Sequence, residues 1–169
     1  MRVRGLCYVF VFGLSAGCAQ PPTAEIDIAG ARVEKAKREG ATEYASEILL
    51  EAEEALTRAQ THLSDPSQYR EAVQAAATAS LRADEARKQA IEEKSKIARS
   101  AGRCLKEIRA LLEESQSLGA ESDPLEAYVA RADTIRSTLE AGSVADAFVA
   151  SKTLKQELLV WLKNLESSR

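Results

Sequence analysis

Residues whose side chains could do chemistry are few in this chain of 169 residues. It has one histidine, His62, and three cysteines, Cys7, Cys18 and Cys104. One imidazole and thiols this far apart along the chain do not supply the ligand cluster that a zinc site needs. We therefore expect no metal, no cofactor and no small-molecule substrate.

Two short patterns look catalytic but lack the context that catalysis requires. Residues 13–17 formally match Gly-x-Ser-x-Gly, yet neither a strand nor later triad partners accompany them. Adjacent acids such as Glu53 and Glu54 point in different directions from a helix, which predicts solvated charge rather than an acid–base pair. We predict that the protein is not an enzyme and has no catalytic residues.

Four basic residues recur three or four positions apart, which places them on one face of a helix. They are Lys96, Arg99, Arg103 and Lys106, with Arg109 nearby. This basic stripe is either a solvated face paired with neighbouring acids or a docking surface for an acidic partner, a lipid headgroup or a cell-wall polymer. The candidate acids are Glu92, Glu93 and Glu107. The formal net charge of −3 argues against general nucleic-acid binding, so we expect no nucleic-acid partner.

Residues 1–18 combine a basic head, an apolar run and an end of small residues. Arg2 and Arg4 precede the apolar residues 5–14, and residues 15–18 are Ser-Ala-Gly-Cys. The apolar run is too short to span the roughly 30 Å core of a bilayer, so it predicts an export signal rather than a membrane helix. The end of the run resembles the lipobox of bacterial lipoproteins, whose usual form is Leu-Ala-Gly-Cys.

The lipobox resemblance implies a signal peptide at residues 1–17, a lipid on Cys18 and a lipidated tether at 18–23. The membrane would then be a partner through this N-terminal lipid. Ala19, in place of an aspartate, implies an outer-membrane protein that faces the periplasm. The alternative is an ordinary secretory signal with an incidental cysteine. In either case Cys7 leaves with the signal, and we expect Cys104 to be a buried, unreactive thiol.

A seven-residue apolar repeat predicts one very long helix over residues 66–119, with a narrow stripe typical of coiled coils. At about 1.5 Å per residue, this helix would be roughly 80 Å long. The repeat consists of Ala76, Ala83, Ala90, Ile97, Cys104, Leu111 and Leu118. A second set, three or four positions away, consists of Ala72, Ala79, Ala86, Ala101 and Ile108.

The residues before the long helix predict a partner for its alanine-rich half. Helical spacing runs from Ala24 to Leu63, with a kink or short break plausible at Gly40. Asp65 can cap the next helix, and so short a loop favours an antiparallel hairpin over residues 24–95.

The residues after the long helix predict two further helices of roughly 18 and 24 residues. Asp123 and Pro124 resemble a helix start, and Gly142 marks the turn between the two helices. Residues 96–169 would form a C-terminal bundle that shares the long helix. The predicted fold is thus all-α: a long antiparallel helical hairpin running into a C-terminal three-helix bundle.

Residues 24–95 resemble an alanine-rich helical domain of unknown function in bacterial envelope lipoproteins. The residues that carry the resemblance are Gly40, Ala41, Tyr44, Ala45, Ala52, Ala55, Leu56, Ala59, Tyr69 and Ala72. The family implies no catalytic residues. Some relatives carry a peptidoglycan-binding module after this domain, but residues 120–169 are too short and too helical for it.

Together these features predict a lipid-anchored periplasmic helical protein at the outer membrane. Its role would be structural or that of an adaptor, through an envelope protein partner or self-association. One alternative is an activator or accessory subunit of an envelope enzyme or transport complex. A second is a tetratricopeptide-like scaffold, although a 34-residue period is missing from the sequence.

Overall fold

The computed structural model describes residues 20–167, and within this range all of the regular secondary structure is helical, as the sequence predicts. The predicted signal peptide at 1–17 and the lipidation site at Cys18 lie outside the described residues. The helices are α1 (Thr23–Arg38), α2 (Ala41–Tyr44), α3 (Ser46–His62), the 3₁₀ turn η1 (Pro66–Gln68), α4 (Tyr69–Ser117), α5 (Ser122–Glu140) and α6 (Val144–Ser167).

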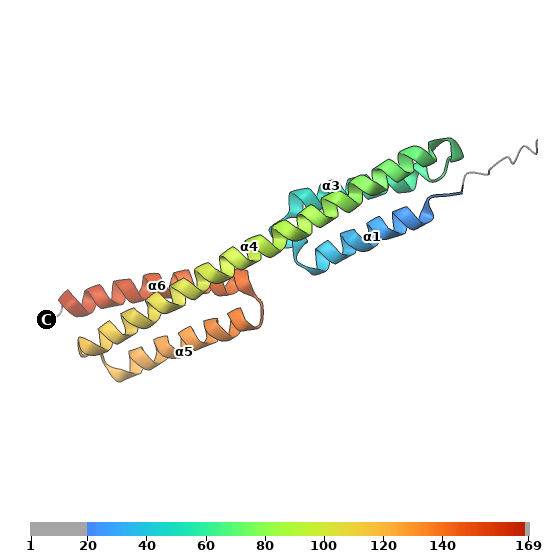
Figure 1. Ribbon diagram of the computed structural model, residues 1–169. Helices are drawn as coiled ribbons and strands as arrows, with labels where there is room; N and C mark the ends of the chain where they lie inside the picture. The colour runs from blue at the N-terminus through green and yellow to red at the C-terminus, as the bar shows by residue number, and fades with distance from the viewer. Residues whose placement is uncertain (1–19, 168–169) are drawn as a thin grey trace, which may run out of the picture.

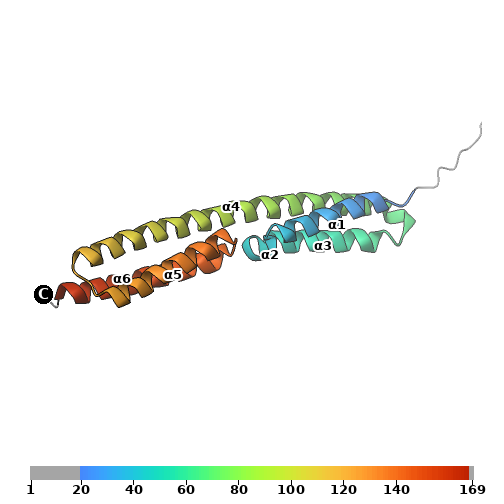
Figure 2. The same ribbon diagram turned by 90° about the horizontal axis from the view of Figure 1, so that it is seen from below.

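Helix α4 is the axis of a rod (Figure 1). Its 49 residues correspond to a length of about 73 Å. Helices α1 to α3 pack on the first half of α4 and form the N-terminal lobe, whereas α5 and α6 pack on the second half and form the C-terminal lobe. Both lobes lie on the same side of α4 (Figure 2). The start of α1 and the end of α6 lie near opposite ends of the rod.

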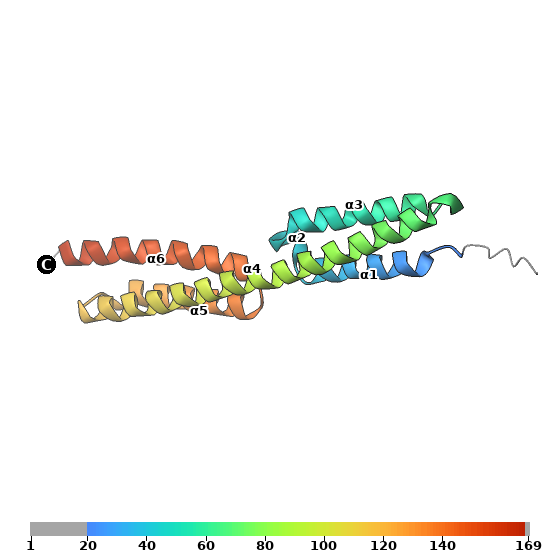
Figure 3. The ribbon, with the colours of Figure 1, turned by 45° about the horizontal axis from the view of Figure 1, so that its top comes forward.

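The N-terminal lobe has three long helices, so the hairpin predicted for residues 24–95 is wrong in this respect. Gly40 has a φ of 99°, in the left-handed region, and ends α1 by a full break rather than a kink. After the single turn of α2, α3 runs back antiparallel to α1, and both helices pack on α4 (Figure 3). The expected α3–α4 pair is present, and α1 adds a third helix to it.

Alanine forms most of the core of the N-terminal lobe. Six alanines in the first half of α4 are at most 1% exposed: Ala72, Ala76, Ala79, Ala83, Ala86 and Ala90. Such small side chains let helix axes approach closely but bury little apolar area per residue. Ion pairs at the rim join the helices: Arg87 on α4 lies 3.1 Å from Glu39 after α1, and Arg82 lies 3.0 Å from Glu51 on α3.

The C-terminal lobe has larger core side chains, as the change of residue type along α4 predicts. Helices α5 and α6, of 19 and 24 residues, fold back on α4. Ile108 of α4 and Leu154 and Leu158 of α6 are completely buried. Two buried hydroxyls are satisfied locally, since Ser115 donates to the Leu111 carbonyl and Ser151 to the Phe148 carbonyl.

The buried stripe of α4 is interrupted between the lobes. After Ala90 the next buried residue of α4 is Ala101, eleven positions later, followed by Ile108, Leu112 and Ser115. The predicted heptad positions Ile97 and Cys104 are only half-buried. A straight helix with 3.6 residues per turn drifts about 20° per heptad, and an eleven-residue step restores the register.

The turns of the two lobes meet at this interruption. A hollow of about 250 Å³ lies between the turn at Gly40 and the turn at Gly142, with Lys94 of α4 and Tyr44 of α2 among its lining residues. Burial in this position raises the pKa of Tyr44, and a hydrogen bond to Glu43 raises the pKa further.

The start of η1 agrees with the prediction from the sequence, whereas the start of α5 differs from it. Asp65 accepts a hydrogen bond of 2.9 Å from the Ser67 amide, so it caps η1 as predicted. Gln68 reaches back to the Asp65 carboxylate at 3.1 Å. By contrast, α5 begins at Ser122 rather than after Asp123, and its cap residue Glu121 makes no side-chain cap hydrogen bond.

Candidate docking surfaces

The basic stripe predicted from the sequence lies on the exposed face of α4, where α4 leaves the N-terminal lobe and enters the C-terminal lobe. Lys96, Arg99, Arg103 and Lys106 are all exposed. Their spacing of three and four residues along one uninterrupted helix keeps them on the side away from the core.

Only one of these four residues forms an ion pair within residues 20–167. Lys96 lies 2.6 Å from Glu93, and this hydrogen bond raises the pKa of Lys96. The guanidinium groups of Arg99 and Arg103 instead donate to the hydroxyls of Ser95, at 2.8 Å, and Ser100, at 3.1 Å. Two acids that could have neutralised the stripe do not, because Glu92 forms no ion pair in this range and Glu107 pairs with a lysine of α6.

A groove of about 480 Å³ runs between α4 and α6, beside the basic stripe. We call it the α4/α6 groove. Helix α4 contributes Ser100, Arg103, Cys104 and Glu107, and α6 contributes Phe148, Lys152, Lys155, Gln156 and Leu159. These α6 residues are spaced to share one side of a helix, so the groove follows the helix axis.

The charged residues of the α4/α6 groove are mostly positive. Lys155 lies 2.7 Å from Glu107, and this hydrogen bond raises the pKa of Lys155. The Nζ of Lys152 lies 5.5 Å from the centroid of the Phe148 ring, which is the range of a cation–π contact. In the described part of the chain neither Lys152 nor Arg103 has a carboxylate within 4.0 Å.

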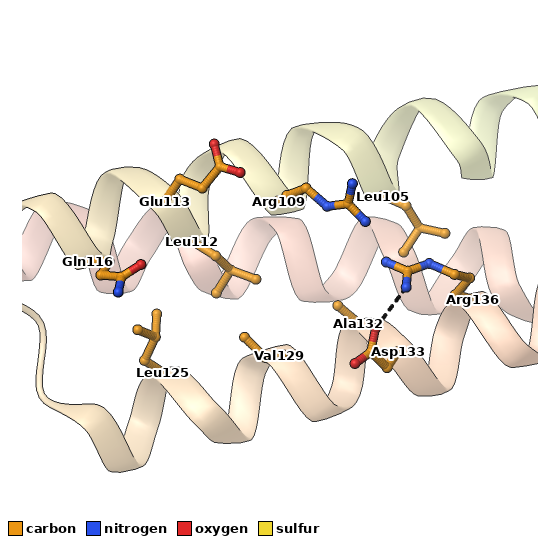
Figure 4. Close-up of a pocket in the computed structure, with 10 residues that line it drawn as sticks. All are labelled: Leu105, Arg109, Leu112, Glu113, Gln116, Leu125, Val129, Ala132, Asp133 and Arg136. Atoms are coloured by element: carbon orange, nitrogen blue, oxygen red, sulfur yellow. Dashed lines mark hydrogen bonds and ion pairs between the residues drawn. The ribbon is translucent and has the colours of Figure 1, made fainter.

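A second groove, of about 350 Å³, separates α4 from α5 (Figure 4). Leu105 and Leu112 of α4 face Leu125 and Val129 of α5 across it, while Arg109 and Glu113 line its edge. Asp133 and Arg136 form an ion pair of 3.0 Å on the opposite edge. Since both signs of charge line this groove, it has no strong preference for a charged ligand.

The remaining reactive side chains occupy structural positions. His62 is the last residue of α3, and its Nδ1 lies 2.5 Å from Oε1 of Gln68. Cys104 is half-buried in the α4/α6 groove, so the expectation of a buried thiol is wrong. Residues 20–167 contain no group of three potential ligands close enough to hold a metal ion.

The sequence predicts the part of the basic surface that lies on α4 but not the part that lies on α6. It identified Arg103, because basic residues recur along one helix face. It did not connect Arg103 with Lys152 and Lys155, which are about fifty residues later in the chain but line the same groove. The available signal was the spacing of Phe148, Lys152, Lys155 and Leu159, which places them on one side of α6.

None of the helices within residues 20–167 combines the length and apolar content needed to cross a membrane. The chain matches no family model, no curated protein and no solved structure.

Proposed function

We propose that this protein is a lipid-anchored periplasmic adaptor that presents its C-terminal lobe to another envelope protein. The observation that carries the proposal is the rod: one 49-residue helix connects a lobe at the start of the described chain to a second lobe at its far end. Such a shape separates an attachment point from a contact surface by a fixed distance.

The predicted lipid anchor would place the N-terminal lobe at the membrane and the C-terminal lobe away from it. From Cys18 to the start of α1 the tether reaches at most about 18 Å, so the N-terminal lobe would lie close to the lipid headgroups. A rod built on α4 can then hold the C-terminal lobe up to about 70 Å from the membrane surface. The Ser-Ala-Gly-Cys sequence at 15–18 and the residue Ala19 support the outer membrane as the site of anchoring.

The surface chemistry favours binding over catalysis. Two grooves of the C-terminal lobe, α4/α5 and α4/α6, are lined by both apolar and charged side chains. Mixed apolar and charged surfaces of this kind suit protein–protein contacts. An activator of an envelope enzyme would use the same surfaces, so it belongs to the same proposal. We do not retain a tetratricopeptide-like scaffold, because such scaffolds stack short helix pairs rather than sharing one long helix.

Photo-crosslinking in cells tests the adaptor role. A photoreactive amino acid replaces exposed Arg103 in the C-terminal lobe or exposed Ala77 in the N-terminal lobe, and membrane fractions are analysed by mass spectrometry. We expect one envelope protein to be recovered from position 103 and none from position 77. Recovery of only this chain from both positions would instead favour a self-assembling structural lipoprotein.

The anchor is tested separately with labelled palmitate. We expect the wild-type chain to incorporate the label and the Cys18→Ala variant to lose it, together with its place in the membrane fraction. Unchanged labelling of the variant would contradict lipidation at Cys18.

A further inference from the structure

Helix α6 leaves three large apolar side chains exposed. Val149 and Val160 are each 63% exposed, and Leu159 is 45% exposed. Exposed apolar residues that occur singly are ordinary, but here Leu159 lines the same α4/α6 groove as the half-buried Phe148 and Cys104. The groove therefore presents apolar side chains that the fold leaves partly uncovered.

The edges of this groove carry a net positive charge. Arg103, Lys152 and Lys155 face a single carboxylate, that of Glu107, which Lys155 already engages at 2.7 Å. Arg103 and Lys152 thus have no carboxylate within 4.0 Å inside the described chain. A ligand with carboxylates on either side of an apolar stripe would satisfy both of these cations.

The length of the groove fits a short helix. From Phe148 to Leu159 the α6 edge extends about 16 Å, the length of three helical turns. A helix laid along the groove would place apolar residues at positions i, i+4, i+7 and i+11, over about 16 Å, against the stretch from Phe148 to Leu159. Acidic residues on the flanks of that helix would lie near Arg103 and Lys152.

We propose that the α4/α6 groove binds an acidic amphipathic helix of the partner protein. This inference rests on the proposed adaptor function and specifies its contact surface and the chemistry of the partner. The net positive charge of the α4/α6 groove favours an acidic helix as its ligand. The α4/α5 groove carries both signs of charge and gives no comparable selection.

Two synthetic peptides of about 18 residues test the proposal, with full-length protein in detergent. Both carry leucine at the same helical positions, but the polar face of one is glutamate and that of the other is lysine. Fluorescence anisotropy at low salt should show binding of the glutamate peptide and at least about tenfold weaker binding of the lysine peptide. Addition of salt should weaken the glutamate complex.

Matched variants locate the binding site. Arg103→Gln/Lys152→Gln removes two charges from the groove and should weaken binding of the glutamate peptide by about tenfold. Arg58→Gln/Lys88→Gln removes the same charge from exposed positions of the N-terminal lobe and should leave binding unchanged. Bound peptide should also slow alkylation of Cys104 in the wild-type protein, measured by mass spectrometry of the fragment that contains this residue.

Several outcomes would overturn the proposal. They are equal affinity for the two peptides, absence of binding, or a larger effect of the Arg58/Lys88 variant than of the Arg103/Lys152 variant. If the protein self-associates and Arg103→Gln/Lys152→Gln abolishes that association, the occupant is a second copy of this chain. A partner crosslinked from position 103 in cells, with no peptide binding in vitro, would preserve the adaptor role and reject only this groove.

Discussion

A Cβ atom on Gly40 would lie 3.2 Å from Cδ2 of Tyr44, and Gly40 has a φ of 99°. Gly40 lies at the break between α1 and α2, where the chain reverses direction. This reversal gives the N-terminal lobe three long helices. A side chain at position 40 would strain the backbone and press on the Tyr44 ring. A Cβ atom on Gly102, inside α4, would meet no other side chain within 4 Å, and the backbone there is helical.

These two glycines give the first prediction. Gly40→Ala should lower the free energy of unfolding by about 1–2 kcal/mol, because alanine is unfavourable in the left-handed region. Gly102→Ala should raise it by up to about 1 kcal/mol, because alanine favours a helix more than glycine does. Urea unfolding followed by circular dichroism measures both. A Gly40→Ala variant as stabilised as Gly102→Ala would indicate a continuous helix through residue 40.

The second prediction concerns the core of the C-terminal lobe. Leu158→Ala removes a fully buried side chain that packs among Ile108, Ile135 and Leu154. We expect a loss of about 2–5 kcal/mol in the free energy of unfolding. Because α5 and α6 pack chiefly on the second half of α4, hydrogen exchange should accelerate in α5 and α6 and change little in α1 and α3. Equal acceleration in both lobes would contradict this division.

The third prediction concerns the N-terminal lobe, whose alanine-rich core leaves little room for larger side chains. Ala83 is fully buried where α4 meets its neighbours, so Ala83→Leu should force the helices apart and cost about 1–3 kcal/mol. Ala77 lies on the exposed side of the same helix, and Ala77→Leu should change stability by less than about 0.5 kcal/mol. Thermal unfolding of the two variants gives the comparison, and tolerance of leucine at position 83 would argue against close helix packing.

The sequence predicts the helices well because their signals are local. The seven-residue repeat of α4, the cap at Asp65 and the turn at Gly142 each depend on neighbouring residues. The return of α1 onto α4 was not predicted, since alanines at helical spacing suit a hairpin as well as a three-helix lobe. The choice depends on the backbone at Gly40, where a kink and a full break have the same sequence signal.

The candidate site was predictable only in part for a different reason. The basic stripe is a property of one helix, so the spacing from Lys96 to Lys106 reveals it. The α4/α6 groove arises from the packing of α6 beside α4. The residue pattern of either helix alone does not predict which faces of the two helices are in contact. The heptad repeat placed Cys104 in the core, but the register shift after Ala90 moves it into the groove.

The fourth prediction follows from Asp65. Hydrogen bonds from the Ser67 hydroxyl and then from the Ser67 amide hold the pKa of Asp65 below its ordinary value. A lowered pKa in the folded state means that Asp65 stabilises the protein above the unfolded-state pKa of about 3.9, and that this contribution is lost as the pH falls through the folded-state pKa. The melting temperature of Asp65→Asn should therefore be lower than that of the wild type at neutral pH, and this difference should shrink below about pH 4. A difference that does not change with pH would contradict the assignment.

The fifth prediction concerns Tyr44, at the meeting point of the two lobes. Burial, followed by a hydrogen bond to Glu43, raises the pKa of Tyr44 above its ordinary value of about 10. The folded state thus holds this proton more tightly, so the stabilising contribution is complete below about pH 10 and is lost as the pH rises through the folded-state pKa. Ultraviolet titration of the wild type minus that of Tyr44→Phe should isolate the Tyr44 phenolate and show a midpoint above pH 10. Denaturant should return this midpoint to the ordinary value. A midpoint at or below the ordinary value in the folded protein would mean that the turn at Gly40 and the turn at Gly142 do not enclose the Tyr44 ring in solution.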